Sequence, residues 1–506
     1  MTISDVLSAA ATEWGSRTAV IYHDRQVSFR ELDILATRCA QGLTELGVGL
    51  GDRVLLSAPN SDGFTVAYHG IMRAGASAVT VNPLLKGPEF AYIIGDCRPK
   101  AAILLTQLAE PVLEGARLAE WPMAVVSMAG PLEGAEALET MLARDASNFV
   151  PPRVPDDACA AVLYTSGTTG RPKGAMLSHH NIVFDARAAA GFFQFLPDDR
   201  LLVVLPMFHA YGGTVGIVVP AVIGATTVPL ERFTPKLVFD AIAKHRVTLC
   251  PAVPSMYSAL LRAADAESVQ ADVSSVRFFI SGGSAMPPAL QRAFEQRFGV
   301  EICEGDGPTE CGPVTCANVP HRKRKIGTVG LAVPGIEIRA VDDQSREVPS
   351  GQIGELVVRG ENVFMGYLNQ SEATAEAMRG GWFHTGDLGF IDEEGYITIV
   401  DRKRDLVIVG GLNVYPREVE DVLVEHPGVA EVAVIGIPDD LRGERVKAFV
   451  APREGWVADE RELLRHCRGR LANYKVPKTI EFRDELPKSQ TGKVLRRQLR
   501  EETSSL

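Results

Sequence analysis

The sequence lacks any apolar run of the about 18 residues that a helix needs to cross a bilayer. Its first residues, MTISDVLSAAATEWGSRTAV, contain no basic segment followed by an apolar core, so we expect no signal peptide. The last residues, TSSL, differ from the SKL peroxisomal address. We therefore expect a cytoplasmic protein without a transmembrane segment.

An excess of positive charge is also missing. The chain carries 52 Lys and Arg against 63 Asp and Glu, a formal net charge of −11. Proteins that bind nucleic acid usually present a basic face. The charge balance therefore argues against a nucleic-acid partner.

Cysteines are few and form no framework. The eight cysteines are scattered, mostly within apolar stretches, which favours reduced thiols over disulfides. Cys311 and Cys316 are close together, but no second Cys or His pair follows at zinc spacing. We interpret these two residues as structural.

The residues that are present indicate a globular chain with more than one domain. At 506 residues the chain exceeds what one hydrophobic core usually serves. Residues 27–47 have apolar positions at helical spacing and end at a glycine, which predicts an amphipathic helix. Strand-like runs follow at 53–60, 76–83, 101–106, 158–167, 200–207, 247–254 and 276–283. Many of them are continuously apolar, which suits strands covered on both faces by helices. The alternation predicts an α/β fold.

The pattern changes after about residue 330. Shorter strand-like segments at 335–342, 354–360 and 395–401 indicate hairpins, with a turn at 392–395. Past residue 401 a compact strand and helix pattern suggests a small α+β domain of usual size. We predict a large domain of sheets and helices with a β-rich subdomain (1–400), a boundary at 401–404, and a small α+β domain (405–506).

A glycine-rich stretch, YTSGTTGRPKG (residues 164–174), directly follows one of the predicted strands. Its three glycines let backbone N–H groups turn toward an anion, while hydroxyl side chains and Lys173 add donors and charge. This composition favours a polyphosphate site over a plain Ser/Thr/Gly turn. It differs from the common phosphate loop because Pro172 stands at the second glycine position.

Three further motifs are weak signals when each is taken alone. In FHTGD (383–387) an acid follows a glycine at the end of a short segment, a placement that can hold ribose hydroxyls or make a turn. PKSQTGK (487–493) places a lysine on a turn near the C-terminus. EGDGPTE (304–310) gathers three carboxylates, without the spacing of a calcium loop.

The motifs YTSGTTGRPKG, GPTE, HTGD, DRKRD with GGLNVYPREVE, and PKSQTGK occur here in the order and spacing of the adenylate-forming superfamily. The chain resembles this superfamily, which includes acyl-CoA synthetases, peptide-synthetase adenylation domains and firefly luciferase, over nearly its whole length, and most of all fatty acyl-CoA synthetases. The resemblance implies two steps: a carboxylate attacks the α-phosphate of ATP, and a thiol then displaces AMP. ATP, Mg²⁺ and coenzyme A are the implied cofactor and co-substrates.

The resemblance also implies roles for single residues. Glu310 and Thr168 would hold Mg²⁺, with Thr309 at the α-phosphate, and Asp387 with Arg402 would take the ribose. The β- and γ-phosphates would be held by Thr165, Ser166, Gly167, Thr168, Thr169 and Lys173. The adenine pocket would be lined by Gly283, Ser284, Ala285, Asp306 and Gly307.

Two segments of the small domain are implied to alternate at the site. Lys493 would contact the α-phosphate and the carboxylate during adenylation. A rotation about Arg404 would then remove it and bring in Gly410 and Gly411, which leave room for the pantetheine arm. Relatives often carry Asp or Lys at the hinge, so Arg404 is a mild departure, and a surface charge in a linker is its plainer interpretation.

The loop PMFHAYGG (206–213) resembles the segment that caps the acid. His209 stands where amino-acid-activating relatives have an Asp, which argues against an amino-acid substrate. Gly212, Gly213 and Val215 are small and apolar and are compatible with an alkyl chain, although an aryl acid would also fit. A core-packing role for His209 is the plainer alternative.

We therefore expect an ATP-dependent acid–CoA ligase acting on a medium- to long-chain fatty acid. The alternatives are an adenylating enzyme for an aryl or other acid that loads a carrier-protein thiol, a non-catalytic nucleotide-binding protein, and a luciferase-type oxidation. A homodimer stays open as an assembly. Asp306 departs from relatives, which usually carry an aromatic residue that stacks on adenine; we expect its carboxylate to accept a hydrogen bond there.

Overall fold

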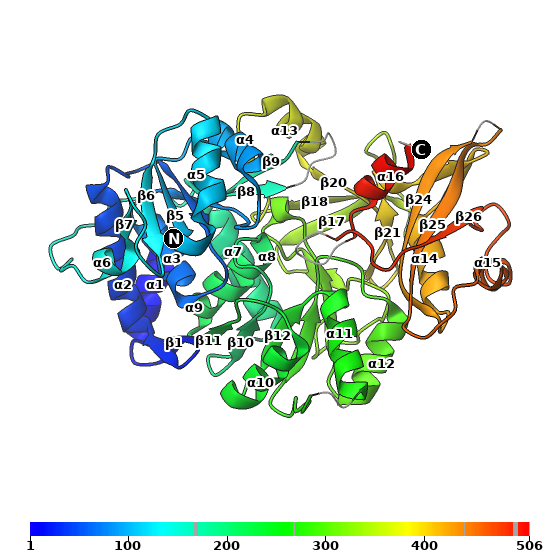
Figure 1. The fold of residues 1–506 in the computed structure, drawn as a ribbon, viewed down its shortest axis with the longest axis horizontal. Coiled ribbons are helices and arrows are strands. Elements are labelled where there is room, and N and C mark those ends of the chain that lie inside the picture. The colour runs from blue at the N-terminus through cyan, green and yellow to red at the C-terminus, as the bar shows by residue number, and fades with distance from the viewer. Residues whose placement is uncertain (166–170, 267–268, 440, 489–493, 505–506) are drawn as a thin grey trace.

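The computed structural model describes residues 1–165, 171–266, 269–439, 441–488 and 494–504. Figure 1 shows sheets and helices of the large N-terminal part on one side and the smaller C-terminal body on the other. Four β-sheets organise these residues. None of the helices in these ranges is long and apolar enough to cross a membrane.

The first sheet is mostly parallel and is buried on both faces. Among the described residues its order is β19 (Gly366–Tyr367), β9 (Lys173–Ser178), β8 (Cys159–Thr165), β4 (Ser77–Thr80), β3 (Arg53–Ser57), β5 (Ala101–Leu105), β6 (Ala124–Met128) and β7 (Glu136–Ala137). Only the pairings of β8 with β9 and of β9 with β19 are antiparallel. One face packs on α4 (Gly87–Cys97) and α5 (Ala109–Leu118).

The second sheet lies across a shared helical layer. Its order is β16 (Leu331–Ala332), β15 (Cys316–Ala317), β14 (Ile302–Asp306), β13 (Phe278–Ser281), β12 (Leu249–Ala252), β10 (Arg200–Val203), β11 (Thr226–Pro229), β1 (Thr18–Tyr22) and β2 (Arg25–Ser28). One large apolar cluster joins both sheets to α1 (Ile3–Glu13), α2 (Phe29–Glu45), α3 (Asp62–Arg73), α7 (His179–Phe193) and α9 (Val219–Ile223). The outer face packs on α10 (Pro235–His245), α11 (Pro254–Asp265) and α12 (Pro288–Phe298).

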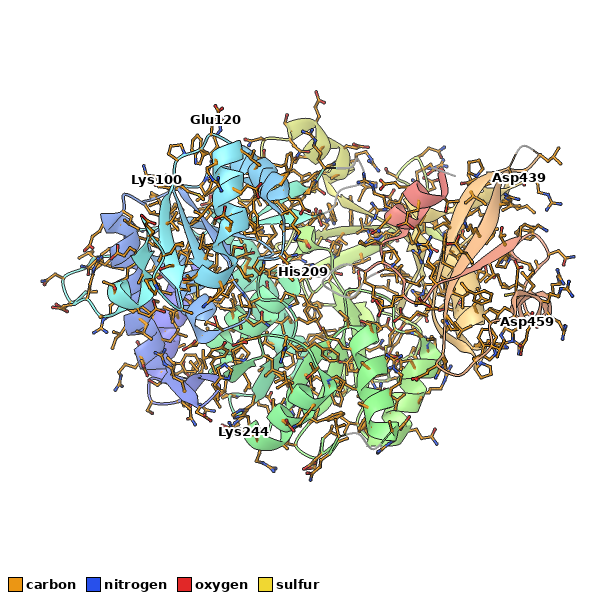
Figure 2. The ribbon with its side chains drawn as sticks, viewed as in Figure 1. Lys100, Glu120, His209, Lys244, Asp439 and Asp459 are labelled. Carbon is orange, nitrogen blue, oxygen red and sulfur yellow. The ribbon has the colours of Figure 1, made fainter. Side chains whose placement is uncertain are left out.

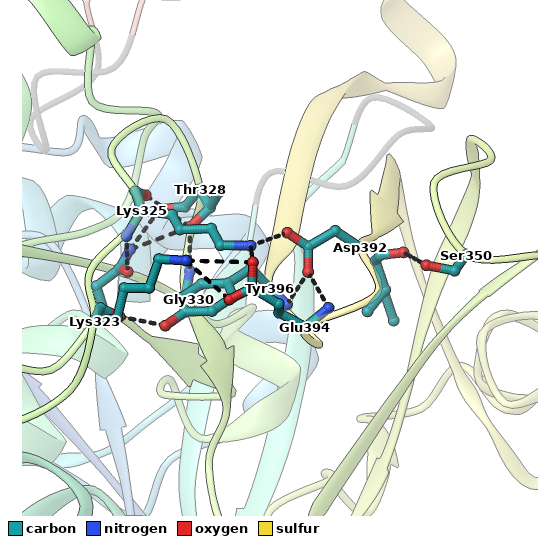
Figure 3. A network of polar contacts seen from close by, with 10 residues as sticks. Lys323, Lys325, Thr328, Gly330, Ser350, Asp392, Glu394 and Tyr396 are labelled. Atoms are coloured by element: carbon teal, nitrogen blue, oxygen red, sulfur yellow. Dashed lines mark hydrogen bonds and ion pairs between the residues drawn. The ribbon is translucent and has the colours of Figure 1, made fainter.

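A four-stranded antiparallel sheet forms the β-rich subdomain. Its order is β17 (Ile336–Val341), β18 (Gly354–Gly360), β20 (Phe383–Ile391) and β21 (Ile397–Arg402). Asp392 holds the β20–β21 turn, because its Oδ1 accepts from the Glu394 and Tyr396 N–H groups, both at 2.9 Å. Its Oδ2 lies 2.5 Å from Lys325 Nζ, which ties the turn to the loop at 323–330 (Figure 3). Short helices α6 (Leu138–Leu142) and α13 (Ser371–Ala377) lie elsewhere on the large part.

The C-terminal body has its own sheet and its own core. The strand order is β23 (Leu412–Val414), β22 (Val407–Val409), β25 (Gly443–Pro452) and β24 (Val429–Asp439), with β26 (Thr479–Phe482) pairing with β25. Helices α14 (Pro416–Val424) and α15 (Glu460–Arg468) pack on one face. Leu499 of α16 (Arg496–Ser504) packs on the other face.

The predicted α/β class with mixed sheets and a small α+β body is confirmed. The helix predicted at 27–47 is α2, and the seven apolar runs contain β3, β4, β5, β8, β10, β12 and β13. The prediction for 383–387 was wrong, because this segment does not end a short element. It begins the nine-residue strand β20, where Gly386 adopts φ +73° next to a register shift in the pairing with β18.

Candidate active site

The glycine-rich stretch connects two paired strands. Thr165 ends β8 and lies directly opposite Lys173, the first residue of β9. The antiparallel pairing therefore places Thr165 and Lys173, the two residues that flank the loop, side by side at one edge, at the end of β8 and the beginning of β9. Ser166, Gly167, Thr168 and Thr169, predicted to bind phosphates, lie outside the described residues.

Glu310 lies at this same edge. It belongs to a single helical turn, Thr309–Cys311, which follows β14. Its Oε1 accepts from the Tyr367 hydroxyl at 2.9 Å and from Thr165 Oγ1 at 3.4 Å. Lys173 Nζ stands 5.1 Å from the centre of the Tyr367 ring, a cation–π distance. The fold thus joins the predicted phosphate loop to the predicted metal ligand.

Tyr367 is a site residue that the motifs did not reveal. It comes from the two-residue strand β19, which pairs with β9, so only the sheet topology brings it beside Glu310. Burial and the Glu310 carboxylate raise the pKa of the Tyr367 phenol, which keeps the hydroxyl protonated as a donor. The one available sequence signal was an aromatic residue in FMGYLN, which is too common to carry a prediction.

Arg402 pairs with the acid of the HTGD motif. Asp387 and Arg402 face each other across β20 and β21, with Oδ1 and Nε 2.8 Å apart. A second Arg402 nitrogen donates to the Thr385 carbonyl at 3.1 Å. Burial lowers the pKa of Arg402, but the charges of Asp387, Asp306 and Glu310 outweigh this effect and raise it. The predicted ribose residue Asp387 therefore pairs directly with this guanidinium group, while the charges of the predicted adenine and metal residues also favour its charged form.

The predicted adenine loop rests on Glu304. Gly283 adopts φ +78° just after β13, a conformation that favours glycine. Glu304 is 2% exposed, and its Oε1 accepts from the Met286 N–H at 2.8 Å, which holds the segment containing Ser284 and Ala285. Its Oε2 has no hydrogen-bond partner among the described residues. Burial raises the pKa of Glu304 to about 7, against the opposing effects of the Met286 N–H and the Arg417 charge.

Gly307 is required by packing. A Cβ atom at this position would lie 1.9 Å from the Pro313 carbonyl oxygen. Any side chain at position 307 would therefore push against the backbone of Pro313, which precedes β15. The backbone carbonyl of Asp306 accepts from the N–H and the hydroxyl of Thr315, both at 2.9 Å, which fixes the loop on the same side.

His209 lies at the start of the short helix α8 (Ala210–Gly213), near the centre of the molecule (Figure 2). Its Nδ1 accepts from the Tyr211 N–H at 3.3 Å. The loop before it is fastened by Asn60, another residue that the motifs did not reveal. The Asn60 amide donates to the carbonyls of residues 203 and 205 and accepts from the N–H of residue 207.

Two segments, one with Lys493 and one with Gly410 and Gly411, were predicted to alternate at the site, and the structure describes only the second. Lys493 lies outside the described residues, although α16 begins three residues later. Gly410 and Gly411 form the exposed turn between β22 and β23, with φ of +59° and +82°. Among the described residues no three His, Cys, Asp or Glu side chains gather to hold a metal ion. A single carboxylate beside hydroxyls suits Mg²⁺, which binds through one or two carboxylates plus substrate phosphates.

Sequence comparisons find the same family along almost the entire chain. The model for the AMP-binding enzyme matches residues 7–368, and the model for its C-terminal domain matches residues 418–493. A long-chain-fatty-acid–CoA ligase of Bacillus subtilis is 34% identical, over 99% of this chain and 94% of its own length. A feruloyl-CoA synthase of Amycolatopsis is 39% identical, over 96% and 95%.

Solved structures agree in fold. The anthranilate-CoA ligase AuaEII in complex with anthranoyl-AMP superposes with a TM-score of 0.94 at 30% identity, over 100% of this chain and 98% of that one. MatB from Rhodopseudomonas palustris is 33% identical and gives 0.91 in its ATP-bound form, over 99% of each chain. The apo form of MatB gives 0.78, over 100% and 99%. The predicted superfamily is confirmed, and the chain belongs to the AMP-binding enzyme family.

Proposed function

We propose that this protein is an ATP-dependent acid–CoA ligase that releases AMP and pyrophosphate. In the first step a carboxylate oxygen bonds to the α-phosphorus of ATP and pyrophosphate leaves. In the second step the CoA thiolate bonds to the acyl carbon, and the bond to the AMP oxygen breaks. The observation that carries this proposal is the edge where Glu310 bonds Thr165 and Tyr367 beside Lys173, together with the ion pair of Asp387 and Arg402.

The first step is mainly an electrostatic problem. A carboxylic acid with a pKa of about 4 to 5 is already ionised at pH 7, so no general base is needed. The difficulty is that an anion must approach a polyanion, so positive charge must be placed where negative charge develops. Lys173 and Lys493 would supply that charge, and Thr309 would touch the α-phosphate. Asp387, oriented by Arg402, would accept hydrogen bonds from the ribose hydroxyls.

Glu310 is the described side chain that suits Mg²⁺ best. Its carboxylate is a hard oxygen ligand, and Tyr367 and Thr165 hold it at the phosphate edge. The metal would neutralise part of the charge on the phosphates. Thr168, also predicted as a ligand, would complete the site together with phosphate oxygens and water.

We propose that the boundary at 401–404 is a hinge between the large part (1–400) and a mobile small domain (405–506). The last strand of the β-rich sheet ends at Arg402, and the C-terminal sheet begins with β22 at Val407. The chain resembles the ATP-bound form of MatB more closely than the apo form. This difference supports an arrangement suited to adenylation, with Gly410 and Gly411 outside the site until rotation.

We propose a medium- to long-chain fatty acid as the substrate. The fatty-acid–CoA ligase relatives support this choice, and an aryl acid is the alternative because of the feruloyl-CoA synthase. One part of the sequence argument needs correction. Gly212 is explained by packing rather than by room for an alkyl chain, since a Cβ there would lie 2.1 Å from the Pro206 carbonyl oxygen. Val215 is likewise buried in the core.

The test is an acid panel. The protein is incubated with ATP, Mg²⁺, CoA and saturated acids of 6 to 18 carbons, as well as benzoic and ferulic acids, and AMP and thioester are measured. We expect AMP with the longer fatty acids. Production of ADP, or no AMP with any acid, would contradict the proposal. AMP without acyl-CoA would favour a carrier-protein acceptor, and activity with aryl acids alone would favour the aryl alternative.

Three finer features stay predictions. We propose a cytoplasmic location, which agrees with the eight free cysteines. A homodimer is a second proposal, and a carrier-protein partner belongs to the alternative function. Size-exclusion chromatography with light scattering measures the oligomeric state.

A further inference from the structure

Asp401, the last residue but one of β21, lies where the large part meets the C-terminal body. Its side chain is buried, with 5% of the residue exposed. Oδ2 accepts from the Arg417 N–H at 2.8 Å, and Oδ1 accepts from the Arg402 N–H at 2.8 Å. Arg417 belongs to α14 of the C-terminal body, so the Asp401 carboxylate joins the end of β21 to that body (Figure 1).

The contact with Arg417 gives a hydrogen-bond acceptor to an N–H group in the first turn of α14. The first N–H groups of a helix have no partner within the helix, and carboxylates are favoured there by the helix dipole. Tyr415 occupies the N-cap position of α14 and makes no side-chain cap. Asp401 therefore supplies, from the end of β21, a cap that the sequence around α14 lacks.

The Arg417 side chain adds a second contact between α14 and β21. One of its nitrogens donates to the Ile399 carbonyl of β21 at 2.7 Å. Its charge also acts on buried Glu304, whose pKa it lowers against the larger effect of burial. The N-terminal turn of α14 thus docks on β21 at the end of the β-rich sheet.

Arg496 ties the same junction to the segment that contains Lys493. It begins α16, three residues after Lys493. Its guanidinium group binds Glu420 of α14 through two nitrogens, at 2.5 and 3.1 Å. A third nitrogen lies 3.3 Å from Asp405 and 3.7 Å from Asp401. Arg496 therefore links α16, α14 and both acids that flank residues 402–404.

We propose that Asp401 is a positioning residue for adenylation: it caps α14 and, with Arg496, holds the C-terminal body so that Lys493 is presented to the α-phosphate. The inference rests on the proposed function. When the body rotates for the thioester step, the cap on α14 and the contact with Arg496 are lost, because Asp401 stays with β21. Asp401 therefore favours the first half-reaction and has no role in the chemistry of the second.

The test separates the two half-reactions in Asp401→Ala and Asp401→Asn. Acid-dependent exchange of labelled pyrophosphate into ATP reports adenylation, and CoA with supplied acyl-adenylate reports thioester formation. We expect exchange to fall about tenfold in Asp401→Ala and the thioester rate to be unchanged. Asp401→Asn keeps an oxygen for the Arg417 N–H but loses the charge, so its exchange rate should lie between those of wild type and Asp401→Ala.

Asp392→Asn is the matched control. Asp392 also caps a backbone turn and pairs with a lysine (Figure 3), but it precedes β21, whereas Asp401 lies near the other end of that strand. We expect it to leave the ratio of the two rates unchanged. Equal losses in both half-reactions of Asp401→Ala, or no loss in either, would overturn the inference. Wild-type protein that makes no AMP with any acid would instead refute the proposed function.

A double-mutant cycle checks the link to Lys493. If Asp401 and Arg496 act together, Asp401→Asn and Arg496→Gln combined should reduce exchange by less than the product of the single effects. Independent effects that multiply would show that Asp401 acts on α14 alone and would remove Arg496 from the account.

Discussion

Glu304→Gln should make the stability of the protein less sensitive to pH. Glu304 is almost fully buried on β14, with one oxygen bonded to the Met286 N–H and the other without a partner among the described residues. Burial raises the pKa of this carboxyl from 4.5 to about 7, although Arg417 lowers it and Asp306 and Asp421 raise it further. Glutamine has the same shape and stays neutral at every pH.

The sign and size follow from the two pKa values. Because the folded value exceeds the unfolded one, the neutral carboxyl is favoured in the folded state. This advantage is complete below pH 4.5 and is lost as the pH rises through about 7. Such a rise in pKa corresponds to about 3 kcal/mol, most of which develops between pH 5 and pH 8.5. Glu304→Gln should therefore gain most of that unfolding free energy over wild type across this interval.

Urea unfolding of both proteins at pH 5 and pH 8.5, followed by tryptophan fluorescence, measures the effect. Glu372→Gln, at an exposed position on α13, is the control and should behave like wild type at both pH values. If the free energies of unfolding of Glu304→Gln and wild type differ by the same amount at pH 5 and at pH 8.5, Glu304 does not titrate in this range. The argument that burial is the main influence on the pKa of Glu304 would then be wrong.

Four further substitutions test single parts of the site. Lys493→Ala should lower pyrophosphate exchange by about 100-fold or more while thioester formation from supplied acyl-adenylate changes little; equal losses would contradict the role of Lys493. Glu310→Gln should raise the Mg²⁺ concentration for half-maximal activity about tenfold, and an unchanged titration would exclude Glu310 as a ligand. Asp387→Asn should weaken ATP binding about tenfold by calorimetry but not that of pyrophosphate. Asn60→Ala should lower the urea unfolding free energy by about 2 to 4 kcal/mol, and a loss under about 0.5 kcal/mol would refute its role in fastening the loop.

Regular elements were predictable because their signals are local. Helix α2 has a full apolar face, a Ser28 side chain that caps the Glu31 N–H, and a glycine two residues after its last residue. Strand ends were less accurate. The run at 53–60 ends as a strand at Ser57, and the Asn60 side chain instead bonds the backbone at the end of β10 and just beyond it. Such a contact joins residues far apart in sequence and leaves no local pattern.

The residues of the site were likewise predictable where a local motif marks them and hidden where only a tertiary contact does. Asp387 and Arg402 were predicted from separate motifs, and the pairing of β20 with β21 brings them together. Tyr367 could not be predicted, because its role depends on β19 adding to β9. The cap that Asp401 provides to Arg417 was equally hidden, since it depends on how two separately folded bodies meet.

The central claim is that a carboxylate oxygen of the acid bonds directly to the α-phosphorus of ATP. The most direct measurement uses a fatty acid labelled with ¹⁸O in its carboxyl group, together with ATP, Mg²⁺ and CoA, and mass spectrometry of the nucleotide product. Because the thiol breaks the bond between the acyl carbon and the bridging oxygen, one ¹⁸O atom should appear in each AMP formed. Unlabelled AMP, or label in inorganic phosphate alongside ADP, would contradict the account.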